Sequence, residues 1–180
     1  MKKYELTAEF IEKWGKKLFR IKALISFGSV EAGELGGYVE KEDNLAQDGD
    51  AWVYGDARVY GDAWVYGDAR VCGNAEVCGD AWVYGDAWVY GDARVCGDAW
   101  VYGNAEVCGN ADYLLIGRIG SRFSFTTFFK NKDKGITVSC GCFLGTIAEF
   151  RAKVTDTHGN NKHAKMYNLA ADMAELQILG

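Results

Sequence analysis

Eleven consecutive hexapeptides occupy the chain from residue 49 to residue 114. They run without an insertion as GDAWVY, GDARVY, GDAWVY, GDARVC, GNAEVC, GDAWVY, GDAWVY, GDARVC, GDAWVY, GNAEVC and GNADYL. A short period repeated this regularly is typical of a solenoid, in which each repeat packs mainly on its neighbours. The repeat therefore predicts a rod rather than a globular core for this part of the chain.

Each hexapeptide predicts one short strand and one corner. Its Ala and Val lie two positions apart and alternate with a variable residue, which is the pattern of a strand with one buried face. The Gly-Asp or Gly-Asn pair that follows favours a turn, because Gly accepts positive φ and Asp or Asn bonds to nearby backbone. Ala and Val are therefore expected to point inward.

The repeat resembles the hexapeptide-repeat family, in which an aliphatic residue is followed four positions later by a small one. Three such pairs open the repeat: Val53 with Ala57, Val59 with Ala63, and Val65 with Ala69. The resemblance implies a left-handed parallel β-helix of triangular section, three hexapeptides per coil, and a homotrimer. The segments KYELT, LFRIKAL and LGGYVEKEDNLAQDGDAWVYG also resemble the start of phage- and prophage-encoded members of that family.

The flanking sequences divide the chain into three parts. Residues 1–48 are expected to form a β-hairpin and an imperfect first coil, with Val39 and Leu45 in register with the repeats. Residues 49–120 are expected to form the β-helix. Residues 121–180 predict an α+β cap with a second hairpin and two helices, the first starting at the capping box of Thr146 and Glu149.

Residues eighteen apart should stack on one face if three hexapeptides close a coil. One face then carries an aromatic wall, which we define as six residues: Trp64, Trp82, Trp100, Tyr66, Tyr84 and Tyr102. Beside it lies an acidic column of Asp62, Asp80 and Asp98. Exposed aromatic groups on a rod indicate an interaction surface, either for a sister subunit or for another partner, and stacked carboxylates favour a cation or a basic partner.

The other two faces are expected to point outward as well. One carries the alternating charges of Arg58, Glu76, Arg94 and Asp112, which predict a solvated ladder. The other carries Trp52, Arg70, Trp88 and Glu106.

The charge and hydropathy of the chain indicate which partners and which cellular location to expect, and the location indicates the redox state of its cysteines. Residues 49–114 hold nine Asp and two Glu against three Arg, so direct binding to nucleic acid is not expected. The start of the chain lacks the apolar core of a signal peptide, and no apolar run could span a membrane, so a cytoplasmic protein is expected. The six cysteines are accordingly expected to be reduced.

Catalytic residues are scarce. Hexapeptide-repeat acyltransferases use a histidine on or near the coil, whereas this chain has only His158 and His163, both beyond it. The two also fall short of the three histidines of γ-class carbonic anhydrases, so no metal and no cofactor are expected. A thiol pair of Cys140 or Cys142 with His158 stays open as a weaker alternative.

Two arginines could bind phosphate at the start of the cap. Together with Ser121, Arg118 and Arg122 surround Gly117 and Gly120 and could cradle a phosphate. The favoured interpretation is that these residues satisfy the hydrogen bonds of the junction between the coil and the cap.

The function predicted from the sequence is noncatalytic. We expect a phage or prophage accessory protein, a trimeric rod that inhibits or sequesters a host macromolecule, such as a defence-related protein, or a nucleotide-like molecule. An acyltransferase-like enzyme with an intersubunit site and a purely structural spacer are the alternatives.

Overall fold

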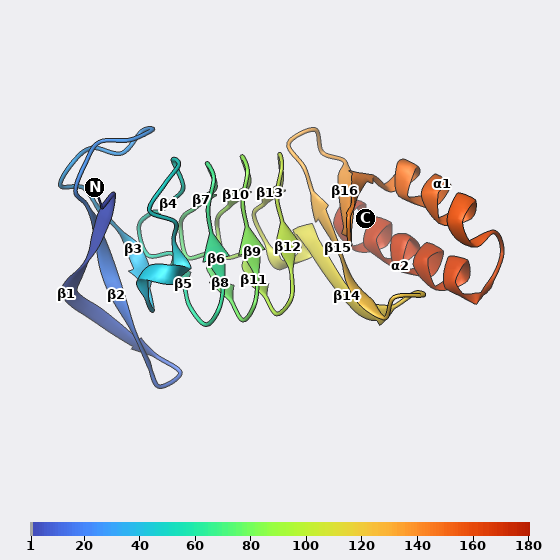
Figure 1. Cartoon of the computed structure of the whole chain (residues 1–180), viewed down its shortest axis with the longest axis horizontal. Coiled ribbons are helices and arrows are strands. Elements are labelled where there is room, and N and C mark those ends of the chain that lie inside the picture. Colours follow the sequence, from blue (N-terminus) through green and yellow to red (C-terminus); the bar gives the residue numbers. More distant parts are fainter. Residues whose placement is uncertain (1) are drawn as a thin grey trace.

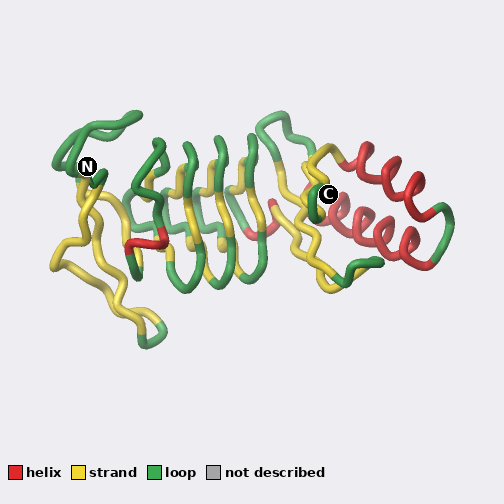
Figure 2. The backbone as a smooth tube through the Cα atoms, viewed as in Figure 1, coloured by secondary structure: helices red, strands yellow, loops and turns green. Residues whose placement is uncertain are grey.

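The computed structural model describes residues 2–180 as an elongated molecule in three parts (Figure 1). N-terminal strands lie at one end, a solenoid occupies the middle, and a sheet with two helices closes the other end (Figure 2). The solenoid strands are β4 (Trp52–Val53), β5 (Arg58–Val59), β6 (Trp64–Val65), β7 (Arg70–Val71), β8 (Glu76–Cys78), β9 (Trp82–Val83), β10 (Trp88–Val89), β11 (Arg94–Cys96), β12 (Trp100–Val101) and β13 (Glu106–Val107).

The strands stack in three parallel sheets with a period of three hexapeptides. One sheet has the order β13-β10-β7-β4, the second β12-β9-β6, and the third contains β5, β8 and β11. Val65 pairs with Val83 and Val83 with Val101, which confirms the predicted register. The repeat Ala and Val side chains are almost completely buried and form one continuous core. The predicted parallel β-solenoid is therefore confirmed.

Glycine at the corners is required for two reasons. Gly79 has a φ of +71°, a conformation that residues with a Cβ rarely adopt. A Cβ on Gly79 would also lie 2.8 Å from the backbone nitrogen of Gly97 in the next coil. At this corner the coils therefore stack too closely for a side chain at the glycine position.

The N-terminal segment extends the third sheet. Its elements are β1 (Tyr4–Lys13), β2 (Lys16–Ala23), β3 (Leu35–Val39) and the 3₁₀ helix η1 (Glu42–Asn44). β1 and β2 pair antiparallel, and β3 pairs antiparallel with β2 and parallel with β5. Val39 aligns with Val59 and Leu45 with Val65, as expected for an imperfect first coil.

This segment buries a residue that the sequence placed on the surface. The expectation that Trp52 points outward into solvent is wrong, because its side chain is fully buried. Tyr4 and Phe27 pack edge-on against the indole, with ring centroids 6.0 and 5.3 Å away. Only the long-range packing of residues 4–30 on the first coil could reveal this.

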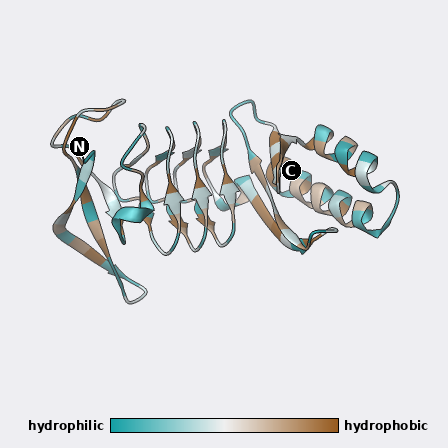
Figure 3. Cartoon of the chain, viewed as in Figure 1, coloured by the Kyte–Doolittle hydropathy of each residue, from teal (hydrophilic) through white to brown (hydrophobic). Residues whose placement is uncertain are grey.

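The cap is a four-stranded sheet covered by two helices. Its elements are β14 (Tyr113–Ile119), β15 (Ser124–Lys130), β16 (Ile136–Cys140), β17 (Phe143–Thr146), α1 (Ile147–His158) and α2 (Lys162–Leu179), preceded by the 3₁₀ helix η2 (Asn110–Asp112). The strands pair antiparallel in the order β14-β15-β16-β17. Phe129 packs on the solenoid core, whereas Phe128 packs toward the helices. The sheet, whose strands are coloured largely hydrophobic in Figure 3, thus contributes to both cores.

The predicted helix signals of the cap are confirmed. Thr146 and Glu149 form the capping box of α1, and Gly159 ends the helix with a φ of +56°. The buried face of α2 consists mainly of alanines with Tyr167 and Ile178. Large apolar side chains instead point into solvent along α2: Met166, Leu169, Met173, Leu176 and Leu179. No helix of residues 2–180 combines the length and hydropathy needed to cross a bilayer.

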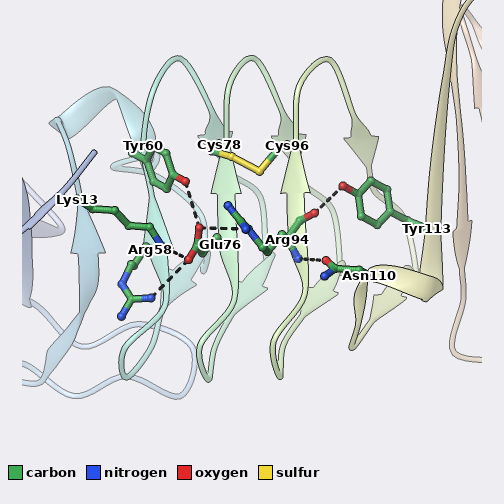
Figure 4. Close-up of a disulfide and its surroundings, with 9 residues drawn as sticks. All are labelled: Lys13, Arg58, Tyr60, Glu76, Cys78, Arg94, Cys96, Asn110 and Tyr113. Carbon is green, nitrogen blue, oxygen red and sulfur yellow. Dashed lines mark hydrogen bonds and ion pairs between the residues drawn. A yellow bond between two sulfur atoms is a disulfide. The ribbon is translucent and has the colours of Figure 1, made fainter. Parts of the chain in front are cut away.

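Two of the six cysteines form a disulfide, so the expectation of six reduced thiols is wrong. Cys78 and Cys96 occupy the same repeat slot in neighbouring coils, with Cα atoms 4.5 Å apart (Figure 4). Stacked strands hold side chains at this spacing, which lies within the range that a disulfide spans. Cys72, Cys108, Cys140 and Cys142 are free.

Glu76 lies next to this disulfide and binds several partners. The solvated ladder expected here is wrong for Glu76, which is only 7% exposed. Lys13 of β1 donates to one carboxylate oxygen, and the Tyr60 hydroxyl donates to the other at 3.1 Å (Figure 4). Arg58 and Arg94 lie 3.6 and 3.5 Å away. Burial alone raises the pKa of Glu76, but the bonds from Lys13 and Tyr60 outweigh it and hold the pKa below its ordinary value.

Replacing Glu76 by glutamine is expected to lower the free energy of unfolding by about 2 kcal/mol near neutral pH, because three cations lose their shared carboxylate. Since the folded-state pKa is depressed, this contribution is present above the ordinary value of 4.5 and is lost as the pH falls through the folded-state value. Denaturant unfolding at several pH values measures it. Equal stability of the two proteins at pH 7 would contradict this expectation, and Glu106→Gln, on another face, is the control.

Candidate functional site

The aromatic wall forms as the sequence predicted. Trp64, Trp82 and Trp100 occupy equivalent positions of β6, β9 and β12, and backbone bonds hold the register, such as Trp64 N–H to Ala81 C=O at 2.9 Å. Because Val points inward from each of these strands, the preceding Trp must point outward. Tyr66, Tyr84 and Tyr102 follow each strand and form the second column of the wall.

The rings of the wall stack mostly on one another. The Tyr66, Tyr84 and Tyr102 rings are nearly parallel, with centroids 4.6 and 4.5 Å apart. Trp82 and Trp100 stack at 5.2 Å, whereas Trp64 meets Trp82 edge-on and stacks on Tyr66 at 4.2 Å. The ring faces in the middle of the wall are therefore already occupied, and its outer surface consists largely of ring edges.

The wall stays partly exposed and uncharged. The exposed fractions of Trp64 and Trp100 are 37% and 38%, which is high for tryptophan side chains that stack on neighbours. Burial raises the pKa of the Tyr84 hydroxyl well above its ordinary value, and Tyr102 and Tyr66 raise it further. The Tyr84 hydroxyl thus remains a neutral hydrogen-bonding group at physiological pH.

The acidic column runs beside the wall and is only partly neutralised. Lys41 donates to the Asp62 carboxylate at 2.7 Å, and this bond and charge hold the pKa of Asp62 below its ordinary value. Asp80 and Asp98 are exposed and form no ion pair with any residue from 2 to 180. Two carboxylates at strand spacing therefore lie without a counterion next to the aromatic rings.

A hollow opens at each end of the wall. The one near the N-terminal segment has a volume of about 550 Å³, and Trp64, Trp82, Asp62 and Lys41 are among its lining residues. The one near the cap has a volume of about 220 Å³, with Asp98, Trp100 and Phe125 in its lining. The wall is thus a ridge between two depressions.

The two arginines singled out in the sequence contact different parts of the cap. The Arg118 guanidinium carbon lies 6.0 Å from the centroid of the Phe125 ring, and Phe125 lines the smaller hollow. Arg122 lines a separate cavity in the cap, together with Ser121. The backbone of Gly120 is covered, because a Cβ there would lie 1.9 Å from the Tyr167 hydroxyl oxygen.

The cap cavity also brings together residues whose role the sequence left open. Cys140, Cys142 and His158 line it along with Arg122. The Cys140 thiol accepts a hydrogen bond from the Thr126 hydroxyl at 3.2 Å. His163 lies just outside, with its ring centroid 5.8 Å from that of His158. The sequence suggested proximity of Cys140 or Cys142 to His158 but not their proximity to Arg122, because Arg122 comes from a separate turn, between β14 and β15.

Comparison with known proteins supports the repeat architecture. Residues 51–67 and 87–103 match the family described as YdcK Beta solenoid repeat. Each match spans about one coil, and together they include Trp64 and Trp100 of the wall. No curated protein matches the chain. The matches and the stacked parallel sheets together identify the chain as a β-solenoid repeat protein.

Proposed function

We propose that the protein is a noncatalytic binding protein that contacts a basic partner protein through the aromatic wall and the acidic column. The observation that carries this proposal is the lack of counterions at Asp80 and Asp98 beside exposed Trp64 and Trp100 rings. Interface cores are enriched in Trp and Tyr, and charge complementarity selects the partner. A surface evolved to bind nucleic acid, such as that of a host defence nuclease, has the required positive charge.

The wider biological setting is part of the same proposal. The resemblance of the repeats and of the N-terminal segment supports membership of the hexapeptide-repeat family, a left-handed coil, a homotrimer and a phage or prophage origin. Action in the host cytoplasm belongs to the same proposal. A homotrimer held through the wall itself would instead hide it from a foreign partner.

The charge of the column provides the first test. The double variant Asp80→Lys/Asp98→Lys is expected to weaken partner binding at least tenfold, because it replaces attraction by repulsion. Asp56→Lys/Asp92→Lys is the matched control, since it makes the same change at exposed positions of the one corner that does not adjoin the wall strands. Proteins enriched from host extract by the wild type are purified and titrated against all three forms. Unchanged affinity of the first variant would reject the proposed surface.

The aromatic rings provide the second test. Trp64→Ser/Trp100→Ser should abolish the same enrichment, whereas Trp88→Ser, at 45% exposure on a different face, should retain it. Native mass spectrometry of each form reports the subunit number. Dissociation of a trimer only in the wall variant would assign the wall to self-association instead.

A nucleotide-like ligand is a second candidate, favoured by one observation. The 220 Å³ hollow places Trp100 near Phe125, over which the Arg118 guanidinium lies. In this hollow, a nucleotide base could stack on Trp100 at the end of the tryptophan column, and the phosphate of the same nucleotide could contact Arg118. Isothermal titration with a nucleotide panel tests this candidate, and heat that persists in Trp100→Ala would exclude the hollow as the site.

A further inference from the structure

A cavity of about 280 Å³ lies in the cap, on the other side of the Cys140–Cys142 turn from the smaller hollow that Asp98 and Trp100 line. The turn between β14 and β15 and the turn between β16 and β17 meet α1 and α2 there (Figure 1). Its lining residues are Ser121, Arg122, Cys140, Cys142, Phe143, Phe150, Lys153, Val154, Thr157, His158 and Tyr167. The volume is near the lower end for small-molecule sites, which measure about 300–1,000 Å³.

The polar groups of this cavity are basic or neutral. Arg122 and Lys153 are its charged residues, and neither Asp nor Glu belongs to the lining. Arg122 forms no ion pair with a carboxylate of the described chain. Lys153 forms one ion pair there, with the exposed Asp156 at 3.4 Å. This arrangement is unusual in a chain of net charge −5, in which acidic residues outnumber basic ones. The cavity therefore provides a local positive potential without an internal counterion.

Arg122 is positioned by a glycine of the opposite turn. Gly141 has a φ of +60°, and a Cβ there would lie 2.8 Å from the Nη1 atom of Arg122. The guanidinium thus lies across the turn that separates Cys140 from Cys142, where a side chain at position 141 would displace it. The guanidinium therefore lies against this turn at the edge of the cavity, while the residue stays exposed to solvent.

The cavity also combines apolar surface with a neutral tyrosine hydroxyl. Phe143, Phe150 and Val154 supply apolar surface, and Phe150 is almost completely buried. Burial and the neighbouring Cys140 together raise the pKa of the Tyr167 hydroxyl to about 12, against an opposing effect of Arg122. The hydroxyl consequently stays protonated and able to donate a hydrogen bond.

We propose that this cavity binds a small amphipathic anion, a carboxylate or phosphate monoester attached to a compact apolar group. The anionic group contacts Arg122 and Lys153, and the apolar group packs on Phe143 and Phe150. The site is independent of the aromatic wall, so either proposal can fail without the other.

Isothermal titration with phenyl phosphate tests the site on the full chain. A dissociation constant on the order of 1 mM or tighter is expected for so small a ligand. Inorganic phosphate and phenol, which each supply half of the recognised chemistry, should bind at least tenfold more weakly. Equal binding of inorganic phosphate would overturn the apolar half of the proposal, and no binding of phenyl phosphate, benzoate or octanoate would overturn it entirely.

Charge reversal locates the bound anion. Arg122→Glu should weaken phenyl phosphate binding more than tenfold and Lys153→Glu severalfold. Arg118→Glu is the matched control, because Arg118 is equally exposed and lies just before the same turn but does not line the cavity. All three positions are on the surface, so the variants should keep the wild-type circular dichroism. Equal weakening by Arg118→Glu would indicate nonspecific attraction and reject the site.

The free thiols give a readout that does not depend on affinity measurements. Saturating phenyl phosphate should slow alkylation of Cys140 and Cys142 by iodoacetamide, followed by peptide mass spectrometry. Cys108, a free and exposed thiol of the solenoid, should react at an unchanged rate. Binding without protection of Cys140 or Cys142 would place the ligand elsewhere and contradict the proposal.

Discussion

Replacing Trp52 by alanine is expected to lower the free energy of unfolding by about 3–5 kcal/mol, the cost typical of removing a large buried aromatic side chain. The indole is fully buried between the first coil and the N-terminal segment, where Tyr4 and Phe27 contact it. Its loss would leave a cavity at the junction that holds β1 to β3 on the solenoid. Denaturant unfolding followed by circular dichroism measures the change.

Trp88→Ala is the control for this prediction. Trp88 stands in the same repeat slot and the same sheet as Trp52, but it is 45% exposed. Its removal should cost less than about 1 kcal/mol, as for most surface substitutions. Trp52→Phe should fall between the two, because the Nε1 donor of Trp52 has no hydrogen-bond partner to lose. Equal losses for Trp52→Ala and Trp88→Ala would show that the N-terminal segment does not cover the first coil.

Opening the Cys78–Cys96 disulfide is expected to lower the free energy of unfolding by about 3 kcal/mol, because a cross-link over a sequence separation of 18 restricts the unfolded chain. The bond also joins β8 to β11, which are paired strands of neighbouring coils, and it lies next to Glu76 and the cations that contact it. Cys78→Ser/Cys96→Ser should therefore lower the denaturation midpoint of the oxidised protein. Addition of reductant should destabilise the wild type and leave this variant unchanged.

Cys72→Ser/Cys108→Ser is the matched control for the disulfide. These cysteines occupy the same repeat slot on another face, but Tyr90 of the intervening coil separates them, and both are free. Their replacement should change stability little, with or without reductant. A wild type that is insensitive to reductant and carries six alkylatable thiols after gentle purification would contradict the disulfide.

The sequence predicted the features that depend on local periodicity. A period of six with Val and Ala in fixed positions leaves one register in which all of them are buried, so the sheets, the aromatic wall and the acidic column could be read from residue spacing. The same rule of eighteen residues per coil also brings Cys78 next to Cys96. The prediction of six reduced cysteines rests on the expected cytoplasmic location, which carries no information about this spacing.

Other features depend on contacts between segments distant in the sequence. The repeat slot of Trp52 is identical to that of Trp88, and only the packing of Tyr4 and Phe27 distinguishes them. Lys13 reaches Glu76 from a strand that the repeat does not specify. The cap cavity likewise combines Arg122, Cys140 and Tyr167 from three separate elements.

The sequence by itself therefore determined the solenoid, because a short repeat fixes both the strand period and the residues that face inward. The tertiary structure alone decided which outward residues remain on the surface and which cap residues surround a cavity. The physical reason is that burial at the ends of a rod depends on how nonrepetitive segments close over it, and local periodicity carries no information about that packing.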